Sequence, residues 1–176
     1  MWEPNLVLAA VVLAAFPASA LPARGAAVPE VSVEGIDGRT RMLPDRRIAI
    51  LVVCESRTAR AQNHHVEALL DRVTAGAANR ARVELVPVAD VESYDFWPAR
   101  RYVRADIRAR IRRDGTEIYV DWKGRVRRAW GLSRDKSAFV LLGVDGRVRF
   151  AAEGPLGKPQ VDDLVSRLAE LGVTVR

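Results

Sequence analysis

A continuous apolar run from Ile48 to Cys54 (IAILVVC) constrains the fold more than any other feature of this chain. An apolar run without alternation indicates a strand buried on both faces, as in a parallel or mixed sheet that has helices on either side. The chain has 176 residues and is 49% hydrophobic, which is enough for one domain with a sizeable core. We therefore expect one α/β domain built around this strand.

Strand and helix patterns alternate on both sides of the central run, with turn residues between them. Pro98 is expected to open the longest helix, and Gly115 to stop it. The expected elements are a hairpin over residues 31–43, a helix over 58–73, a strand over 82–88 that stops near Pro87, a helix from Pro98 to about Arg113, a strand over 118–121, one or two helical turns over 126–132, a hairpin over 139–150 and a closing helix over 159–171.

The first twenty residues have the pattern of a secretory signal peptide. An apolar run of eleven residues, Leu6 to Phe16, is too short to span a bilayer of about 30 Å, and the small residues Ala18-Ser19-Ala20 follow it. We expect cleavage after Ala20, with a cut nearer Ala26 or an uncleaved anchor as alternatives. The predicted organisation is a signal peptide over residues 1–20, a short linker over 21–27 and one domain over 28–176, in a protein that is periplasmic or secreted and is not integral to the membrane after cleavage.

The scarcity of cysteine and histidine excludes several kinds of chemistry. One Cys and two His cannot form an intrachain disulfide, a CxxC dithiol or a zinc site of four Cys and His ligands. We therefore expect no metal and no cofactor.

Several segments of the chain have the order and spacing of a known family. They are Tyr119 to Leu132 (YVDWKGRVRRAWGL), Ser137 to Phe150 (SAFVLLGVDGRVRF), Glu153 to Leu156 (EGPL), the loop from Glu55 to Asn63 and Tyr102-Val103-Arg104. The segments of the last third resemble the C-terminal half of a thioredoxin-fold protein of the peroxiredoxin type, and the whole set more narrowly resembles the YtfJ family of bacterial periplasmic proteins. The resemblance covers roughly Val28 to Leu171. It implies a thioredoxin-like fold, with a central mixed β-sheet flanked by helices and an N-terminal β-hairpin.

This resemblance also implies where reactive thiols would lie, namely at the start of the first helix. Those positions fall on Thr58 and Ala61, neither of which can form a disulfide. The proline that the fold usually holds in cis would lie at about Lys136 or Ser137 and is absent. We therefore favour a non-catalytic envelope module that binds or supports another protein of unknown identity.

The alternative function is a monothiol oxidoreductase or redox sensor that uses Cys54. Arg57 and Arg60 are close in sequence and could lower the pKa of the thiol. However, Cys54 ends an apolar strand, where a free cysteine usually behaves as a small buried hydrophobe. We expect a buried Cys54 with a raised pKa.

Four arginines are spaced along one side of the long helix, within about 80° of one another. They are Arg101, Arg104, Arg108 and Arg112. The chain has a net charge of +6, and such a stripe suits an anionic partner: an acidic protein, a phosphorylated lipid headgroup or an envelope polyanion. A solvated helix face is the alternative interpretation. Nucleic acid is not expected, because no aromatic residues interleave with the arginines.

Three further groups of residues are open to a functional and a structural interpretation. His64 and His65 point about 100° apart on a helix, so surface positions are favoured over a shared metal site. The carboxylates of Glu84, Asp90, Glu92 and Asp95 could bind a cation, but a solvated loop is favoured. Finally, we expect Trp97, Trp122 and Trp130 to pack in the core or in turns.

Overall fold

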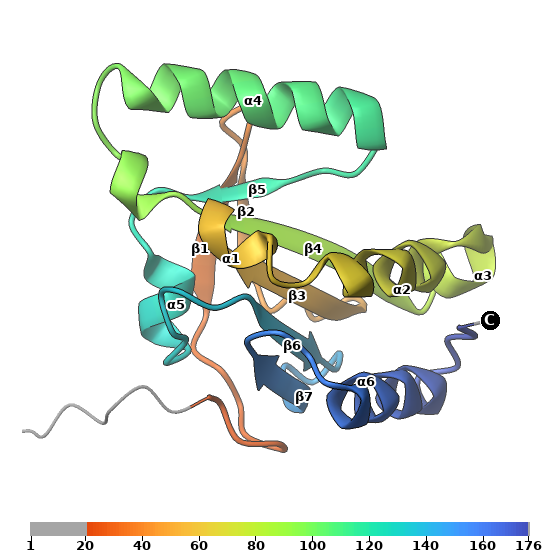
Figure 1. Cartoon of the computed structure of the whole chain (residues 1–176). Helices are drawn as coiled ribbons and strands as arrows, with labels where there is room; N and C mark the ends of the chain where they lie inside the picture. The colour runs from red at the N-terminus through yellow and green to blue at the C-terminus, as the bar shows by residue number, and fades with distance from the viewer. Residues whose placement is uncertain (1–20, 176) are drawn as a thin grey trace, which may run out of the picture.

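The structure is a computed structural model that describes residues 21–175. The predicted signal peptide lies outside the described residues. The strands are β1 (Val31–Gly35), β2 (Thr40–Leu43), β3 (Ala49–Glu55), β4 (Val83–Asp90), β5 (Tyr119–Asp121), β6 (Ala138–Leu142) and β7 (Val148–Glu153). They form one seven-stranded sheet in the order β2-β1-β5-β4-β3-β6-β7 (Figure 1).

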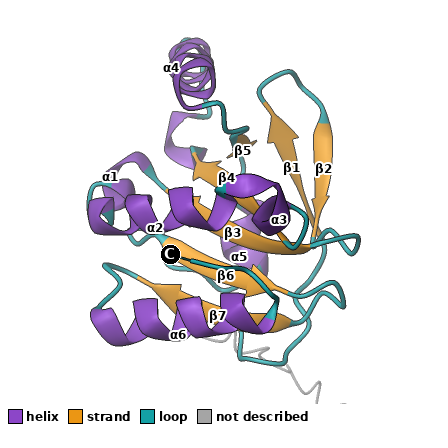
Figure 2. Cartoon of the chain, turned by 90° about the vertical axis from the view of Figure 1, so that its right-hand side faces the viewer, coloured by secondary structure: helices purple, strands orange, loops and turns teal. Residues whose placement is uncertain are grey.

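Helices connect and flank these strands. They are α1 (Arg57–Arg60), α2 (His64–Thr74), α3 (Gly76–Arg80), the short 3-10 helix η1 (Glu92–Tyr94), α4 (Ala99–Asp114), α5 (Arg125–Ala129) and α6 (Lys158–Glu170). Figure 2 shows α2, α3 and α6 in front of the sheet and α5 behind it, with α4 at one end of the molecule.

The expected central strand is confirmed as β3. It pairs in parallel with β4 and antiparallel with β6, so the sheet is mixed. Its residues from Ala49 to Cys54 are all buried. The N-terminal hairpin is also confirmed, and it joins the same sheet because β1 pairs antiparallel with β5. Together these features confirm the thioredoxin-like α/β architecture.

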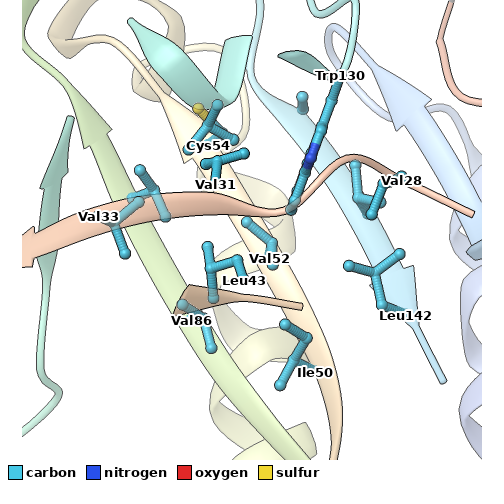
Figure 3. Packing of buried hydrophobic residues seen from close by; sticks show 14 of the residues in the cluster. Val28, Val31, Val33, Leu43, Ile50, Val52, Cys54, Val86, Trp130 and Leu142 are labelled. Carbon is cyan, nitrogen blue, oxygen red and sulfur yellow. The ribbon is translucent and has the colours of Figure 1, made fainter. Parts of the chain in front are cut away.

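Alternate residues of β3 enter two different hydrophobic clusters, one on each face of the sheet. Ile50, Val52 and Cys54 pack with Trp130 and the N-terminal strands on one face (Figure 3). On the other face, residues of β3 pack against α2 and α6. A third, smaller cluster lies under α4 and includes Ile107 and Trp122.

The prediction of one helix over residues 58–73 is wrong in one respect, because this segment forms two helices, α1 and α2. The chain leaves helical geometry between Arg60 and His64, and Asn63 is buried there. The side chain of Asn63 accepts a hydrogen bond of 3.1 Å from the backbone N–H of Leu156, far away in the sequence. This long-range contact holds the break between α1 and α2.

The second expected strand runs further than predicted. β4 passes through Pro87 and ends at Asp90. β5 pairs only with Val88 to Asp90, so one edge of β4 is open at Pro87 and can accommodate a residue without an N–H.

The long helix begins and ends as expected. Pro98 is its N-cap residue, and Gly115 ends α4 in the left-handed conformation, with φ of 67°. Its sheet-facing side is short of apolar residues, with Ile107 buried and Val103 and Ile111 partly buried. The helix therefore rests on a narrow contact, which leaves space beside it.

Candidate functional site

A groove runs between α1 and α2 on one side and α4 on the other, over the carboxyl end of β3. It consists of two adjoining cavities of about 470 Å³ and 390 Å³. Both cavities are lined by Glu55, Arg60, Pro87, Arg110 and Ile118. The carboxyl ends of strands are where open α/β sheets usually hold their ligands.

Glu55 ends β3 at this groove, and Ser137 lies beside it directly before β6. The Ser137 hydroxyl is fully buried and donates a hydrogen bond of 3.2 Å to Oε2 of Glu55. Burial raises the pKa of the Glu55 carboxyl, although Arg60, with Nε 3.8 Å away, and the Ser137 hydrogen bond oppose that shift. A partly desolvated carboxyl in a cleft is typical of a functional site.

The opposite wall of the groove belongs to α4. Tyr102, Val103 and Arg110 line it. The Nε of Arg110 is buried, and no residue of the described chain accepts a hydrogen bond from it. Buried donors are nearly always paired, so this nitrogen is suited to a partner with a carbonyl or carboxylate oxygen.

The start of α1 carries no thiol. Ser56 caps this helix, and its hydroxyl accepts a hydrogen bond of 3.2 Å from the backbone N–H of Ala59. Thr58 lies within α1 and Ala61 follows its last residue. None of residues 55–63 is cysteine, so this helix start has no sulfur to activate.

Cys54 points away from the groove, because successive side chains of a strand alternate between faces. It belongs to the cluster on the far face with Ile50 and Val52 (Figure 3), whereas Val53 lines the groove. The side chain is buried, and burial raises its pKa well above the ordinary value, with a further contribution from Asp90 and Asp121. The expected burial of Cys54 is confirmed.

Residues 47–171 match the protein family described as "Bacterial protein of unknown function (YtfJ_HI0045)". The chain belongs to this family. A relative from Haemophilus influenzae, described as an uncharacterized protein, is 33% identical over 51 residues. That match spans 29% of this chain and 28% of the relative's length.

Solved structures similar to this YtfJ-family chain have the thioredoxin-like fold. A peroxiredoxin-like protein from Aquifex aeolicus aligns with a TM-score of 0.56 at 12% identity, over 88% of this chain and 90% of that one. The exposed lipoprotein thioredoxin of Streptococcus pneumoniae strain TIGR4 aligns with a TM-score of 0.58 at 12% identity, over 81% of this chain and 99% of that one. At such identities the likeness shows the fold alone.

The arginine stripe is only partly as expected. Arg101, Arg108 and Arg112 are exposed. Arg104 instead turns toward the sheet, where it pairs with Glu34 at 2.6 Å and lies over the ring of Trp122 at 5.5 Å. Arg104 therefore helps to hold α4 in place and does not belong to the free stripe.

The four carboxylates form neither a single cation site nor a fully solvated loop, because Asp90 belongs to β4 and is buried. Glu84 pairs with Arg41 at 2.6 Å, away from the other three carboxylates. Asp90 and Glu92 both bind Arg127, while Asp95 pairs with Lys123 and Arg100. Within residues 21–175 no group of His, Cys, Asp and Glu side chains has an arrangement that could hold a metal ion.

The two histidines lie at the surface and have separate contacts. His65 Nε2 lies 2.8 Å from the carbonyl oxygen of Leu156, and His64 Nδ1 lies 3.5 Å from Glu67. Of the three tryptophans within residues 21–175, Trp122 and Trp130 are buried as expected. The expectation that Trp97 packs in the core or in a turn is wrong, because 86% of that residue is exposed.

Sequence reasoning missed the pairing of Glu55 with Ser137 and the role of Arg110 in the groove wall. The one available signal is that Glu55 is a charged residue directly after the apolar run of β3. Within residues 21–175, no helix is both long enough and apolar enough to cross a bilayer.

Proposed function

We propose that this YtfJ-family protein is an exported, non-catalytic binding module of the cell envelope, and that it holds a segment of a partner protein in the groove between α1 and α4. The observation that carries the proposal is the set of side chains that line the groove. Its walls carry the Glu55 carboxyl and the unpaired Arg110 Nε, whereas the only thiol faces the opposite side of the sheet.

The groove has a size and chemistry suited to a short extended peptide. Ligand sites commonly enclose about 300–1,000 Å³, with mostly apolar walls and a few polar groups that fix orientation. Here Tyr102, Val103 and Ile107 provide the apolar wall. Glu55 can accept a hydrogen bond from a peptide N–H, and Arg110 can donate one to a peptide carbonyl. A partner backbone supplies both of those groups at regular spacing.

The export part of the proposal rests on the apolar run and the Ala18-Ser19-Ala20 sequence before the domain. The non-catalytic part rests on Thr58 and Ala61, which occupy the positions where the resemblance to thioredoxins places cysteines. The alternative, a monothiol function, has less support because Cys54 has neither access to the groove nor a lowered pKa.

Site-specific photo-crosslinking in intact cells tests this function. A photoreactive residue at Tyr102 is expected to trap a partner protein, whereas the same residue at exposed Ser166 on α6 is the control and should trap none. Arg110→Met and Glu55→Gln should each weaken the crosslink, and Cys54→Ala should leave it unchanged. Equal crosslinking from Tyr102 and Ser166, or loss with Cys54→Ala in a folded protein, contradicts the proposal.

A further inference from the structure

The side of α4 that faces away from the groove carries three arginines, Arg101, Arg108 and Arg112. They are exposed and fall within about 40° of one another around the helix axis. None of the three forms an ion pair with another residue of the described chain. The face therefore presents three uncompensated positive charges along about 16 Å of helix.

Three other arginines of α4 are neutralised by carboxylates, and Arg110 lies on the groove side of the helix, which makes this face distinct. Arg100 binds Asp95, Arg104 binds Glu34, and Arg113 binds Asp114. Positive charge that remains unpaired on one side of a helix points to an anionic partner outside the chain.

Two large, exposed aromatic residues precede α4 in the chain, a few residues before Arg101. Phe96 is 58% exposed and Trp97 is 86% exposed. Adjacent exposed aromatic residues are unfavourable in water and mark interaction surfaces. The indole of tryptophan in particular favours the boundary between water and lipid, where one part of the ring is apolar and the N–H is hydrated.

The position of α4 in the fold suits contact with a flat surface. Both views show α4 as the outermost element at one end of the molecule, remote from α6 (Figures 1 and 2). A plane that touches this end meets the helix along its length before it meets the sheet.

We propose that this face docks on the surface of a bilayer that contains anionic phospholipids. The three guanidinium groups bind lipid phosphates, and Phe96 and Trp97 enter the headgroup region. A bilayer is favoured over an acidic protein because its phosphates can adjust to three arginines on a convex helix that has no pocket of its own. Docking leaves the groove open, because Tyr102 and Arg110 lie on a different side of α4. The proposal is therefore independent of the partner held in the groove.

Vesicle co-sedimentation tests the proposal, with the protein purified as the cell processes it. Vesicles of phosphatidylglycerol with phosphatidylcholine are compared with vesicles of phosphatidylcholine alone. We expect binding only to the former, weakened by added salt. Replacing Arg101, Arg108 and Arg112 by Gln should lower the bound fraction by at least about tenfold.

A matched control distinguishes an effect of this face on binding from an effect of the net charge. Arg24, Arg82 and Arg125 are also exposed, and replacing these three by Gln removes the same charge elsewhere. The control variant should bind as the wild type does, and Phe96→Ala with Trp97→Ala should weaken binding without a change in charge. Equal loss in both triple variants, binding to heparin but not to vesicles, or no binding by the wild type overturns the proposal.

Discussion

The hydroxyl of Ser137 donates a hydrogen bond of 3.2 Å to the carboxylate of Glu55, and so joins the start of β6 to the end of β3. Ser137 is one of the two positions, with Lys136, at which the resemblance to thioredoxins places a proline, and Glu55 lies three residues before Thr58, the first position at which it places a thiol. In this chain a hydroxyl and a carboxyl group meet beside that helix start.

The Glu55 carboxyl should make stability depend on pH. Because burial raises its pKa in the folded state, the folded protein is penalised at pH values above that pKa and gains stability as the pH falls toward the unfolded value of about 4.3. Glu55→Gln keeps an acceptor for Ser137 and removes the charge. Its melting temperature should exceed that of the wild type at neutral pH, and the difference should shrink in acid. A variant that is less stable at neutral pH than the wild type contradicts this assignment.

The thiol of Cys54 should be unreactive in the folded protein. It is 4% exposed, and burial raises its pKa, so little thiolate is present and reagents cannot reach it. Iodoacetamide labelling should be negligible in buffer across neutral pH and complete in denaturant, which serves as the control. The folded protein should also neither reduce insulin nor consume peroxide with a thiol donor. Rapid labelling in buffer, together with activity that Cys54→Ser abolishes, would restore the monothiol interpretation.

The ion pair of Arg127 with Asp90 should matter for stability. Arg127 Nε lies 3.1 Å from Oδ2 of Asp90, and both side chains are largely buried, at 17% and 7% exposure. Arg127→Met leaves a buried carboxylate without its cation, so we expect a loss of about 3 kcal/mol in the free energy of unfolding. Arg128 also binds Glu92 but is 53% exposed, and Arg128→Met should cost less than about 1 kcal/mol. Similar losses in the free energy of unfolding for both variants, measured in urea, would contradict the expectation that the more buried ion pair contributes more to stability.

Export should remove the first twenty residues. The short apolar run and Ala18-Ser19-Ala20 predict a mature protein that begins at Leu21 and is recovered outside the cytoplasm. Intact-mass measurement of the protein from fractionated cells checks both points. Recovery of the full-length chain from the cytoplasmic fraction, with a cytoplasmic marker enzyme as the reference, rules the prediction out.

Much of the fold follows from local patterns. The seven-residue β3, the hairpins and α6 are each determined by the spacing of apolar residues and by turn residues close in sequence. Distant contacts decide the exceptions. The break before α2 depends on the bond between Asn63 and Leu156, and α3 is held by Asn79, whose side chain binds both the N–H and the carbonyl of Thr174.

The candidate site is harder to predict from the sequence, because it also depends on contacts between residues that are distant in the chain. Glu55 and Ser137 are 82 residues apart, and only the pairing of β3 with β6 brings them together. The spacing of the arginines along α4 follows from the sequence, but the partner of Arg104 does not, because Glu34 lies on β1, 70 residues earlier in the chain. Helical spacing shows which side chains share a face, but it does not show what that face meets.

The enclosed position of Cys54 has a practical consequence. The chain has one cysteine, and the structure places it in the core, so folding neither forms a disulfide nor exposes a thiol to oxidants. The same native state should therefore be reached in a reducing cytosol and in an oxidising compartment. A domain of this kind needs no oxidative folding machinery, and we expect residues 21–176 to fold when they are produced in an ordinary cytoplasmic expression host.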